Sequence, residues 1–79
     1  MIILGKEFKK LKAYRQLKGI NQVVLANLIG VTVSTYSFKE NGKKSFTLEE
    51  AKCIADYFQK TIDEIFFNDS VNLKFTGVS

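Results

Sequence analysis

The sequence contains no histidine, proline or tryptophan and only one cysteine, Cys53. Without histidine the chain cannot form a Ser/His/Asp triad, use an imidazole as acid or base, or build a His-rich metal site. A single cysteine cannot supply a zinc-type cluster or an internal disulfide. The carboxylates of Asp56, Asp63 and Glu64 fall at polar positions of helical patterns, where a solvated surface outweighs paired acid–base catalysis. We therefore expect no metal, no cofactor and no enzymatic activity.

Long apolar runs and phosphate-binding loops are also missing. The longest apolar runs span residues 1–4 and 23–26, whereas a membrane-spanning helix needs ~18 consecutive apolar residues. The five glycines match neither GxGxxG nor GxxxxGK followed by Ser or Thr. No stretch joins a basic start to an apolar core and a small-residue cleavage site. These absences favour a cytoplasmic protein with no membrane segment and no glycine-rich nucleotide loop.

The remaining composition is that of a small folded domain with unevenly distributed charge. Apolar residues make up 46% and charged residues 25% of the 79 residues, which is ordinary for a globular domain. We expect one domain, residues 1–79, with its core over residues 5–68. Residues 1–45 hold nine bases and two acids (net +7), whereas residues 46–79 hold three bases and six acids (net −3). The basic half is the candidate for binding a polyanion, with solubilising lysines as the alternative.

Helical periodicity and stop signals alternate along most of the chain. Leu4, Phe8 and Leu11 share one helical face, and Gly19 is a natural C-terminal stop. Two Thr-x-x-Glu capping boxes mark the starts of the last two helices. Residues 43–46 are predicted to form a loop. The predicted helices cover residues 5–18, 21 to about 28, about 33 to 40, and 47–58, with a short fifth helix opening at 61.

The last residues follow a different period. Val71, Leu73 and Phe75 alternate with polar residues, which predicts a strand in a tail over residues 70–76. A lone strand edge is unstable, so this strand needs a partner. Residues 1–4 are the candidate partner, within the chain or across a twofold axis that builds a homodimer; a disordered tail on a monomer is the alternative. The predicted fold class is all-α, with five helices and a short C-terminal β-strand.

Residues 21–43 read NQVVLANLIGVTVSTYSFKENGK. This stretch resembles the helix-turn-helix of the Cro/repressor (Xre) family, whose pattern is polar-Gln-x-x-Leu-Ala, then Gly-Val-Ser, then Ser-Thr, and finally Glu-Asn-Gly-Lys. The resemblance covers residues 8–67 and implies a repressor-like fold that binds double-stranded DNA. Ala26 allows the two helices to approach closely and Gly30 supplies the turn, so the second helix can lie in a DNA major groove.

The resemblance makes residues 33–40 the helix that reads DNA. Its base-facing positions would be Val33, Ser34, Ser37 and Phe38. Direct readout normally uses Arg on guanine or Asn and Gln on adenine, and these four positions offer two hydroxyls and two apolar groups instead. Base reading should therefore depend on thymine methyl groups, water and DNA shape. Core packing is the alternative for Val33 and Phe38.

The expected contacts to the DNA backbone flank this helix. Gln22 matches the family residue whose amide holds a phosphate, aided by the positive end of a helix dipole. Asn41, Lys43 and Lys44 lie just past the reading helix, where a loop would follow the DNA backbone. Thr35 could contact a phosphate or simply favour the helix start. An ordinary helix stop with solvated lysines is the alternative for the loop residues.

Arg15 falls on the same helical stripe as Phe8 and Leu11, where an unpaired charge would be costly. The family places a carboxylate opposite this arginine at the end of the reading helix, and that residue here is Glu40. The resemblance therefore implies a structural Arg15–Glu40 pair that joins the first helix to the reading helix.

Val23, Val24 and Leu28 depart from the family because these positions are usually charged or polar. They create an apolar surface beside the DNA-binding unit, and exposed apolar patches usually mark partners. The alternative is that residues 1–4 or 71–75 cover them within one chain.

The function implied by the resemblance is a Cro-like repressor that binds a palindromic operator as a dimer. One alternative is an antitoxin that binds both DNA and a toxin through the apolar surface. Another is a protein-interaction module that kept the fold and lost DNA binding. Salt-dependent affinity for duplex DNA would separate this module from the two DNA-binding proteins.

Overall fold

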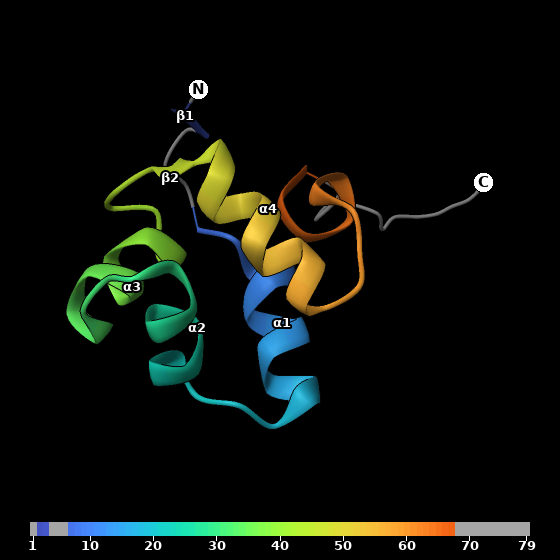
Figure 1. The fold of residues 1–79 in the computed structure, drawn as a ribbon, viewed down its shortest axis with the longest axis horizontal. Coiled ribbons are helices and arrows are strands. Elements are labelled where there is room, and N and C mark those ends of the chain that lie inside the picture. Colours follow the sequence, from blue (N-terminus) through green and yellow to red (C-terminus); the bar gives the residue numbers. More distant parts are fainter. Residues whose placement is uncertain (1, 4–6, 68–79) are drawn as a thin grey trace.

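In the computed structural model, residues 2–3 and 7–67 are described, and they are mainly helical (Figure 1). The predicted all-α fold class is confirmed, with four α-helices, one π-helical segment and a minimal two-stranded sheet. In chain order the elements are β1 (Ile2–Ile3), α1 (Lys9–Lys18), α2 (Gln22–Ile29), α3 (Val33–Glu40), β2 (Phe46–Thr47), α4 (Leu48–Tyr57) and η1 (Asp63–Phe67).

The first helix begins later than predicted. α1 starts at Lys9 rather than at residue 5, and residues 7–8 are not helical. Phe8 has φ −98° and ψ 83°, and its N–H donates to the carbonyl oxygen of Glu40 over 3.0 Å. Phe8 therefore bonds to the end of α3 and does not adopt the helical conformation that periodicity alone predicted.

A short sheet forms where a loop was predicted. Ile2 pairs with Thr47 and Ile3 pairs with Phe46 in antiparallel register, so the prediction of a loop through residue 46 is wrong at its last residue. Residues 1–4 were predicted only as a candidate partner of the tail strand, and the pairing of Ile2–Ile3 with β2 was not predicted. The tail over residues 70–76, with Val71, Leu73 and Phe75, lies outside the described residues, so its predicted strand and its part in a dimer stay predictions.

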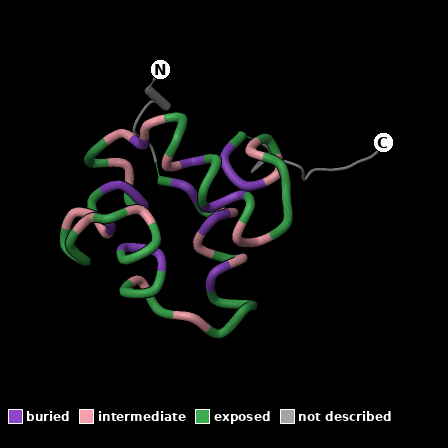
Figure 2. Tube along the Cα trace, in the orientation of Figure 1, coloured by how far each residue is buried: buried purple, intermediate pink, exposed green. Residues whose placement is uncertain are grey.

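An aromatic cluster forms the centre of the core, which lies on the inward sides of the helices (Figure 2). The ring of Phe46 lies 5.6 Å from that of Phe8, 5.2 Å from that of Phe66 and 6.1 Å from that of Tyr36, measured between centroids. Tilted and edge-on ring pairs at such distances are favourable. β2 therefore contributes the side chain that joins the residue before α1 to α3 and η1.

Both predicted capping boxes are present. The Thr47 hydroxyl accepts from the Glu50 N–H over 3.1 Å, and the Glu50 carboxylate accepts from the Thr47 N–H over 3.0 Å. Thr61 and Glu64 make the same reciprocal pair over 2.9 and 3.1 Å. The second box opens a segment that winds as a π-helix over Asp63–Phe67 rather than as an ordinary α-helix.

The turn between α2 and α3 requires a glycine. Gly30 has φ +76°, in the left-handed region that L side chains rarely adopt. Its N–H donates to the carbonyl of Asn27, and the next N–H, that of Val31, donates to the carbonyl of Ala26. These bonds end α2 and set α3 against it, with Ala26 only 1% exposed at the crossing.

Candidate nucleic-acid interface

α3 has one buried face and one exposed face. Tyr36 and Glu40 are fully buried, whereas the four predicted base-reading residues are exposed or half-buried and, at roughly 100° per residue, share an arc of about 140°. Val33 is 43% exposed and Phe38 is 45% exposed, so neither belongs to the core. The four predicted reading residues, Val33, Ser34, Ser37 and Phe38, therefore form a single outward surface.

A threonine that was not among the predicted contacts begins α3. Thr32 is the N-cap, and its hydroxyl oxygen accepts from the N–H of Thr35 over 3.1 Å. The two hydroxyl groups are also 3.1 Å apart and hydrogen-bonded. Thr35 thus helps to start the helix, as one of the two sequence interpretations held. A threonine directly before a helical run is the signal that identifies such a cap.

The loop after α3 is held firmly while its lysines extend into solvent. The N–H groups of Lys43 and Lys44 both donate to the carbonyl of Phe38, over 2.7 and 3.2 Å, and both residues are exposed. Asn41 is exposed as well, and its side-chain amide donates to the Ser37 hydroxyl over 3.3 Å. Two cationic side chains consequently project from a fixed backbone beside the outward face of α3.

Gln22 is the first residue of α2 and contacts the end of α3. Its amide nitrogen donates to a carboxylate oxygen of Glu40 over 3.0 Å, which fixes the direction of the side chain. An amide nitrogen carries two N–H groups, so the bond to Glu40 uses only one of them. The residue is half-buried and stands at the positive end of the helix dipole.

Arg15 and Glu40 form the ion pair implied by the resemblance. Nε of Arg15 lies 2.9 Å from Oε2, and a terminal guanidinium nitrogen donates to Oε1 over 3.1 Å. A second terminal nitrogen donates to the carbonyl of Ile20 over 3.2 Å. The Tyr36 hydroxyl donates to Oε2 over 2.8 Å. With Gln22, three helices therefore supply hydrogen-bond donors to one buried carboxylate.

This network shifts the pKa of each titratable member. Burial raises the pKa of the Glu40 carboxyl, but hydrogen bonds from Arg15, Gln22 and Tyr36 outweigh it, so that the pKa lies below its ordinary value. The hydrogen bond to Glu40 raises the pKa of Arg15. Burial, followed by the negative charge of Glu40, raises the pKa of the Tyr36 hydroxyl. The pair is charged and the tyrosine neutral at neutral pH.

Lys39 joins α3 to α4 and was not predicted to do so. It is 9% exposed, and its Nζ donates to the carbonyl of Ser45 over 2.7 Å and to Glu50 over 3.0 Å. The same Nζ lies 5.7 Å from the centre of the Phe46 ring. The sequence did hold one sign that this residue is unusual, because Lys39 stands at a position where the family has an apolar residue. The pairing with a capping-box carboxylate depends on the fold.

The three apolar residues of α2 that depart from the family pattern are exposed. Val23 is 46%, Val24 36% and Leu28 40% exposed, and α2 contains no charged residue. Ile2–Ile3 pairs with β2, and residues 1 and 4 lie outside the described residues, so coverage of this surface by residues 1–4 stays a prediction. Coverage by residues 71–75 concerns a segment outside the described residues.

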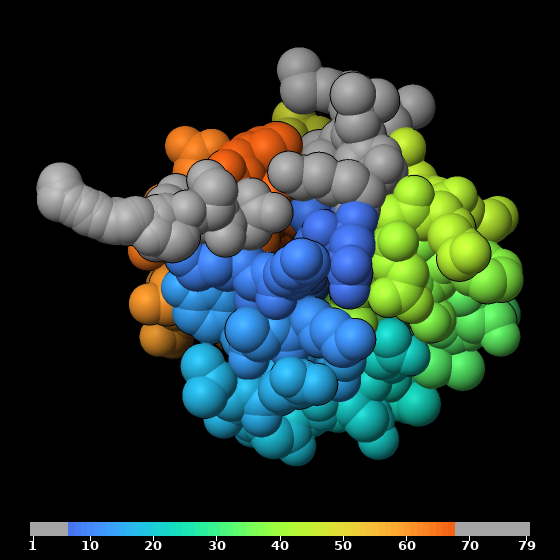
Figure 3. All heavy atoms as spheres, turned by 180° about the vertical axis from the view of Figure 1, so that it is seen from behind, coloured from blue at the N-terminus to red at the C-terminus, as the bar shows by residue number. Residues whose placement is uncertain are grey.

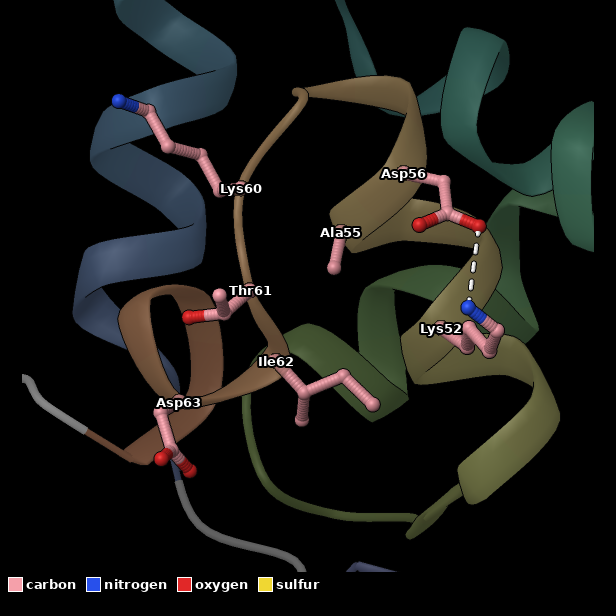
Figure 4. Close-up of a pocket in the computed structure, with 7 residues that line it drawn as sticks. All are labelled: Lys52, Ala55, Asp56, Lys60, Thr61, Ile62 and Asp63. Carbon is pink, nitrogen blue, oxygen red and sulfur yellow. Dashed lines mark ion pairs between the residues drawn. The ribbon is translucent and has the colours of Figure 1, made fainter.

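A polar hollow of about 450 Å³ lies elsewhere, between the end of α4 and the start of η1 (Figure 4). Ala55 and Ile62 turn toward it, while Lys52 and Asp56 pair on its rim over 3.5 Å. In the described part of the chain, no cluster of three or more His, Cys, Asp or Glu could hold a metal, and no helix is long and apolar enough to span a bilayer. The hollow adds nothing to the surface of α3.

The fold and the exposed α3 define a helix-turn-helix DNA-binding protein. The helix-turn-helix family model matches residues 11–65. The chain belongs to this family, in its Xre/Cro type, and is a DNA-binding transcriptional regulator. Comparison with the curated proteins gives no significant match.

Solved structures include similar chains. The restriction-modification controller protein C.AhdI from Aeromonas hydrophila is 28% identical with a TM-score of 0.65, and the match covers 73% of this chain and 88% of that one. A transcriptional regulator from Listeria innocua is 23% identical with a TM-score of 0.71, covering 92% and 81%. FeII HppE is 25% identical with a TM-score of 0.64, but the match covers only 42% of its chain.

Replacing Arg15 by alanine should strand the Glu40 carboxylate in the core. Breaking a buried pair from one side typically costs roughly 3–5 kcal/mol, a large share of the stability of a small domain. Lys9→Ala, on the exposed side of the same helix, should cost less than about 0.5 kcal/mol. Urea unfolding followed by circular dichroism measures both variants, and equal midpoints would show that Arg15 is solvated.

Acid should destabilise the protein through Glu40. The folded-state pKa of this carboxyl lies below its unfolded-state value. Its stabilisation is therefore complete above the unfolded-state pKa and is lost as the pH falls through the folded-state pKa. The free energy of unfolding of Glu40→Gln should fall less steeply than that of the wild type between about pH 5 and pH 2. Glu49→Gln, on an exposed site, is the matched control. Parallel wild-type and Glu40→Gln profiles would contradict this coupling.

Proposed function

We propose that the chain is a Cro-like repressor that binds a palindromic operator as a homodimer, with α3 in the major groove. The observation that carries the proposal is the exposed surface of α3, with Gln22 bonded to Glu40 at the end of this helix and the exposed Lys43 and Lys44 on the loop that follows it. Occupying the operator would exclude polymerase from an overlapping promoter. The membership of the helix-turn-helix family supports the docking of α3.

Within this proposal, the contacts to the phosphates of the DNA backbone have the firmest physical support. Lys43 and Lys44 are exposed cations on a fixed loop, and Gln22 has an amide N–H beyond the one bound to Glu40. Asn41 and Thr35 are weaker candidates, because both side chains already make local hydrogen bonds. Phosphate contacts of this kind set the register of the protein on the duplex.

Base reading would use small groups. Ser34 and Ser37 can donate to or accept from base edges, and Val33 and Phe38 can contact thymine methyl groups. α3 has no arginine, asparagine or glutamine, so fork-like contacts to guanine or adenine from this helix are absent. We therefore expect a substantial share of sequence preference to come from water and DNA shape.

A dimer would place two copies of α3 roughly 34 Å apart, one turn of DNA, and so demand a palindromic site. The proposed dimer contacts remain Val71, Leu73 and Phe75, on the strength of their alternation in the sequence alone. The proposal also places the protein in the cytoplasm, with DNA.

An antitoxin is the second candidate, and the exposed apolar residues of α2 favour it. Val23, Val24 and Leu28 would then contact a protein partner. A module that had lost DNA binding would use the same surface but show no salt-dependent affinity for duplex DNA.

Replacing both loop lysines by alanine should weaken binding to every duplex and reduce the salt dependence. Each lost phosphate contact should lower the slope of log affinity against log salt by roughly 0.9. Lys52→Ala with Lys60→Ala removes the same charge from the side bearing the polar hollow and should change the slope much less. Titrations by fluorescence anisotropy at several salt concentrations test this. An unchanged slope for Lys43→Ala with Lys44→Ala would refute the proposed phosphate contacts of these two lysines.

Selection from random duplex DNA should yield a palindrome. On that site, Ser34→Ala or Ser37→Ala should shift preference at particular base pairs by roughly 1–3 kcal/mol. Lys43→Ala should instead weaken all sequences alike. Circular dichroism checks that the serine variants fold. If both serine variants bind the selected site as tightly as the wild type, these two residues do not read its bases.

A further inference from the structure

The outer side of α1 carries a preformed hollow. Lys10, Ala13, Tyr14 and Leu17 line a cavity of about 190 Å³, and their spacing is i, i+3, i+4 and i+7 along one helix. Four residues with this arrangement form the hole that receives a side chain from a facing helix in knobs-into-holes packing. The geometry therefore fits another helix rather than a small polar ligand.

The walls of this hole are apolar and held in place. Ala13 is exposed and small enough to leave the hole open. Tyr14 is fixed from the inside, because its ring lies 6.0 Å from that of Phe58, and Nζ of Lys60 lies 5.8 Å from its centre. Leu17 is 83% exposed, the highest value among the large apolar side chains of the described chain. A leucine left in water at this position gains free energy when a partner covers it.

The surroundings of the hole are basic. α1 reads KKLKAYRQLK and contains no acid. Its arginine is paired with Glu40 in the core, and its other charged residues are four lysines. Lys18 lies over the ring of Tyr57 at 5.6 Å, and Tyr57 in turn contacts Phe58, whose ring lies against Tyr14. The hydrogen bond from the Thr61 N–H lowers the pKa of Glu64, and the positive charges of Lys60 and Lys10 lower it further.

This charge distribution distinguishes between two kinds of helical partner. A twofold contact between two copies of α1 would place the lysines of one copy against those of the other, and such like-charge contacts are unfavourable. An acidic helix would meet them with opposite charge. Duplex DNA would use the lysines but would leave the apolar hole and Leu17 unexplained.

We propose that the hole formed by Lys10, Ala13, Tyr14 and Leu17 is a docking site for an acidic amphipathic helix of another protein. One apolar side chain of that helix enters above Ala13, and its carboxylates face Lys10, Lys18 and Lys60. The hole adjoins Phe58 and Lys60, whereas α3 lies against α2. Figure 3 shows α1 widely exposed on the face seen from behind. The regulator can therefore hold this partner while α3 is on DNA.

A synthetic peptide tests the site in the full chain. The probe is a fluorescent helical peptide of about four heptads with Leu at positions a and d and Glu at the other positions, and a second peptide carries Lys in place of Glu. The acidic peptide should bind and the basic one should not. Ala13→Leu fills the hole without changing any charge and should weaken binding at least roughly tenfold, as should Leu17→Ser. Leu48→Ser, the same kind of change at an exposed position of α4, should leave peptide affinity unchanged.

Several results would overturn the proposal. One is equal binding of the acidic peptide by the wild type and by both Ala13→Leu and Leu17→Ser, with folding checked by circular dichroism. Another is a loss of duplex DNA affinity in these variants, which would make the surface a nucleic-acid contact. A change from dimer to monomer by light scattering would assign the hole to a second copy. If the acidic peptide binds the double variant Leu73→Ser with Phe75→Ser but not the wild type, the hole is occupied by the chain's own tail.

Discussion

The buried carboxylate of Glu40 is the group on which the arrangement of the first three helices depends. It sits at the end of α3 with no exposed surface and accepts hydrogen bonds from Arg15 of α1, Gln22 of α2 and Tyr36 of α3. A buried charge is tolerated only when it is paired and its lone pairs are satisfied. Alternative packings that separate these helices would strand the charge, so the network disfavours them.

The same network links the core to the surface proposed to face DNA. Gln22 donates to Glu40, so the residue proposed to hold a phosphate is positioned by the core. Lys39 extends this linkage to Ser45 and Glu50 and thereby fixes the loop that carries the exposed lysines. Rigid support of this kind reduces the ordering that binding would otherwise require.

Local signals predicted most of the helices and their caps. The box of Thr47 and the turn at Gly30 involve residues within a few positions of one another, and both form as expected. Errors occurred where distant segments meet. The start of α1 is set by a bond from Phe8 to Glu40, and β2 exists because Ile2–Ile3 pairs with it. Periodicity carries no information about either contact.

The sequence by itself determined the all-α class, the helix-turn-helix pattern, the basic first half and the extent of the helix over residues 33–40, because these depend on short-range spacing and composition. The tertiary structure alone decided which side chains are buried. It placed Val33 and Phe38 outside, turned Lys39 inward onto Glu50, and left the hole around Ala13 open on α1. Burial depends on how distant helices cover one another, and that geometry is fixed only when the whole chain packs.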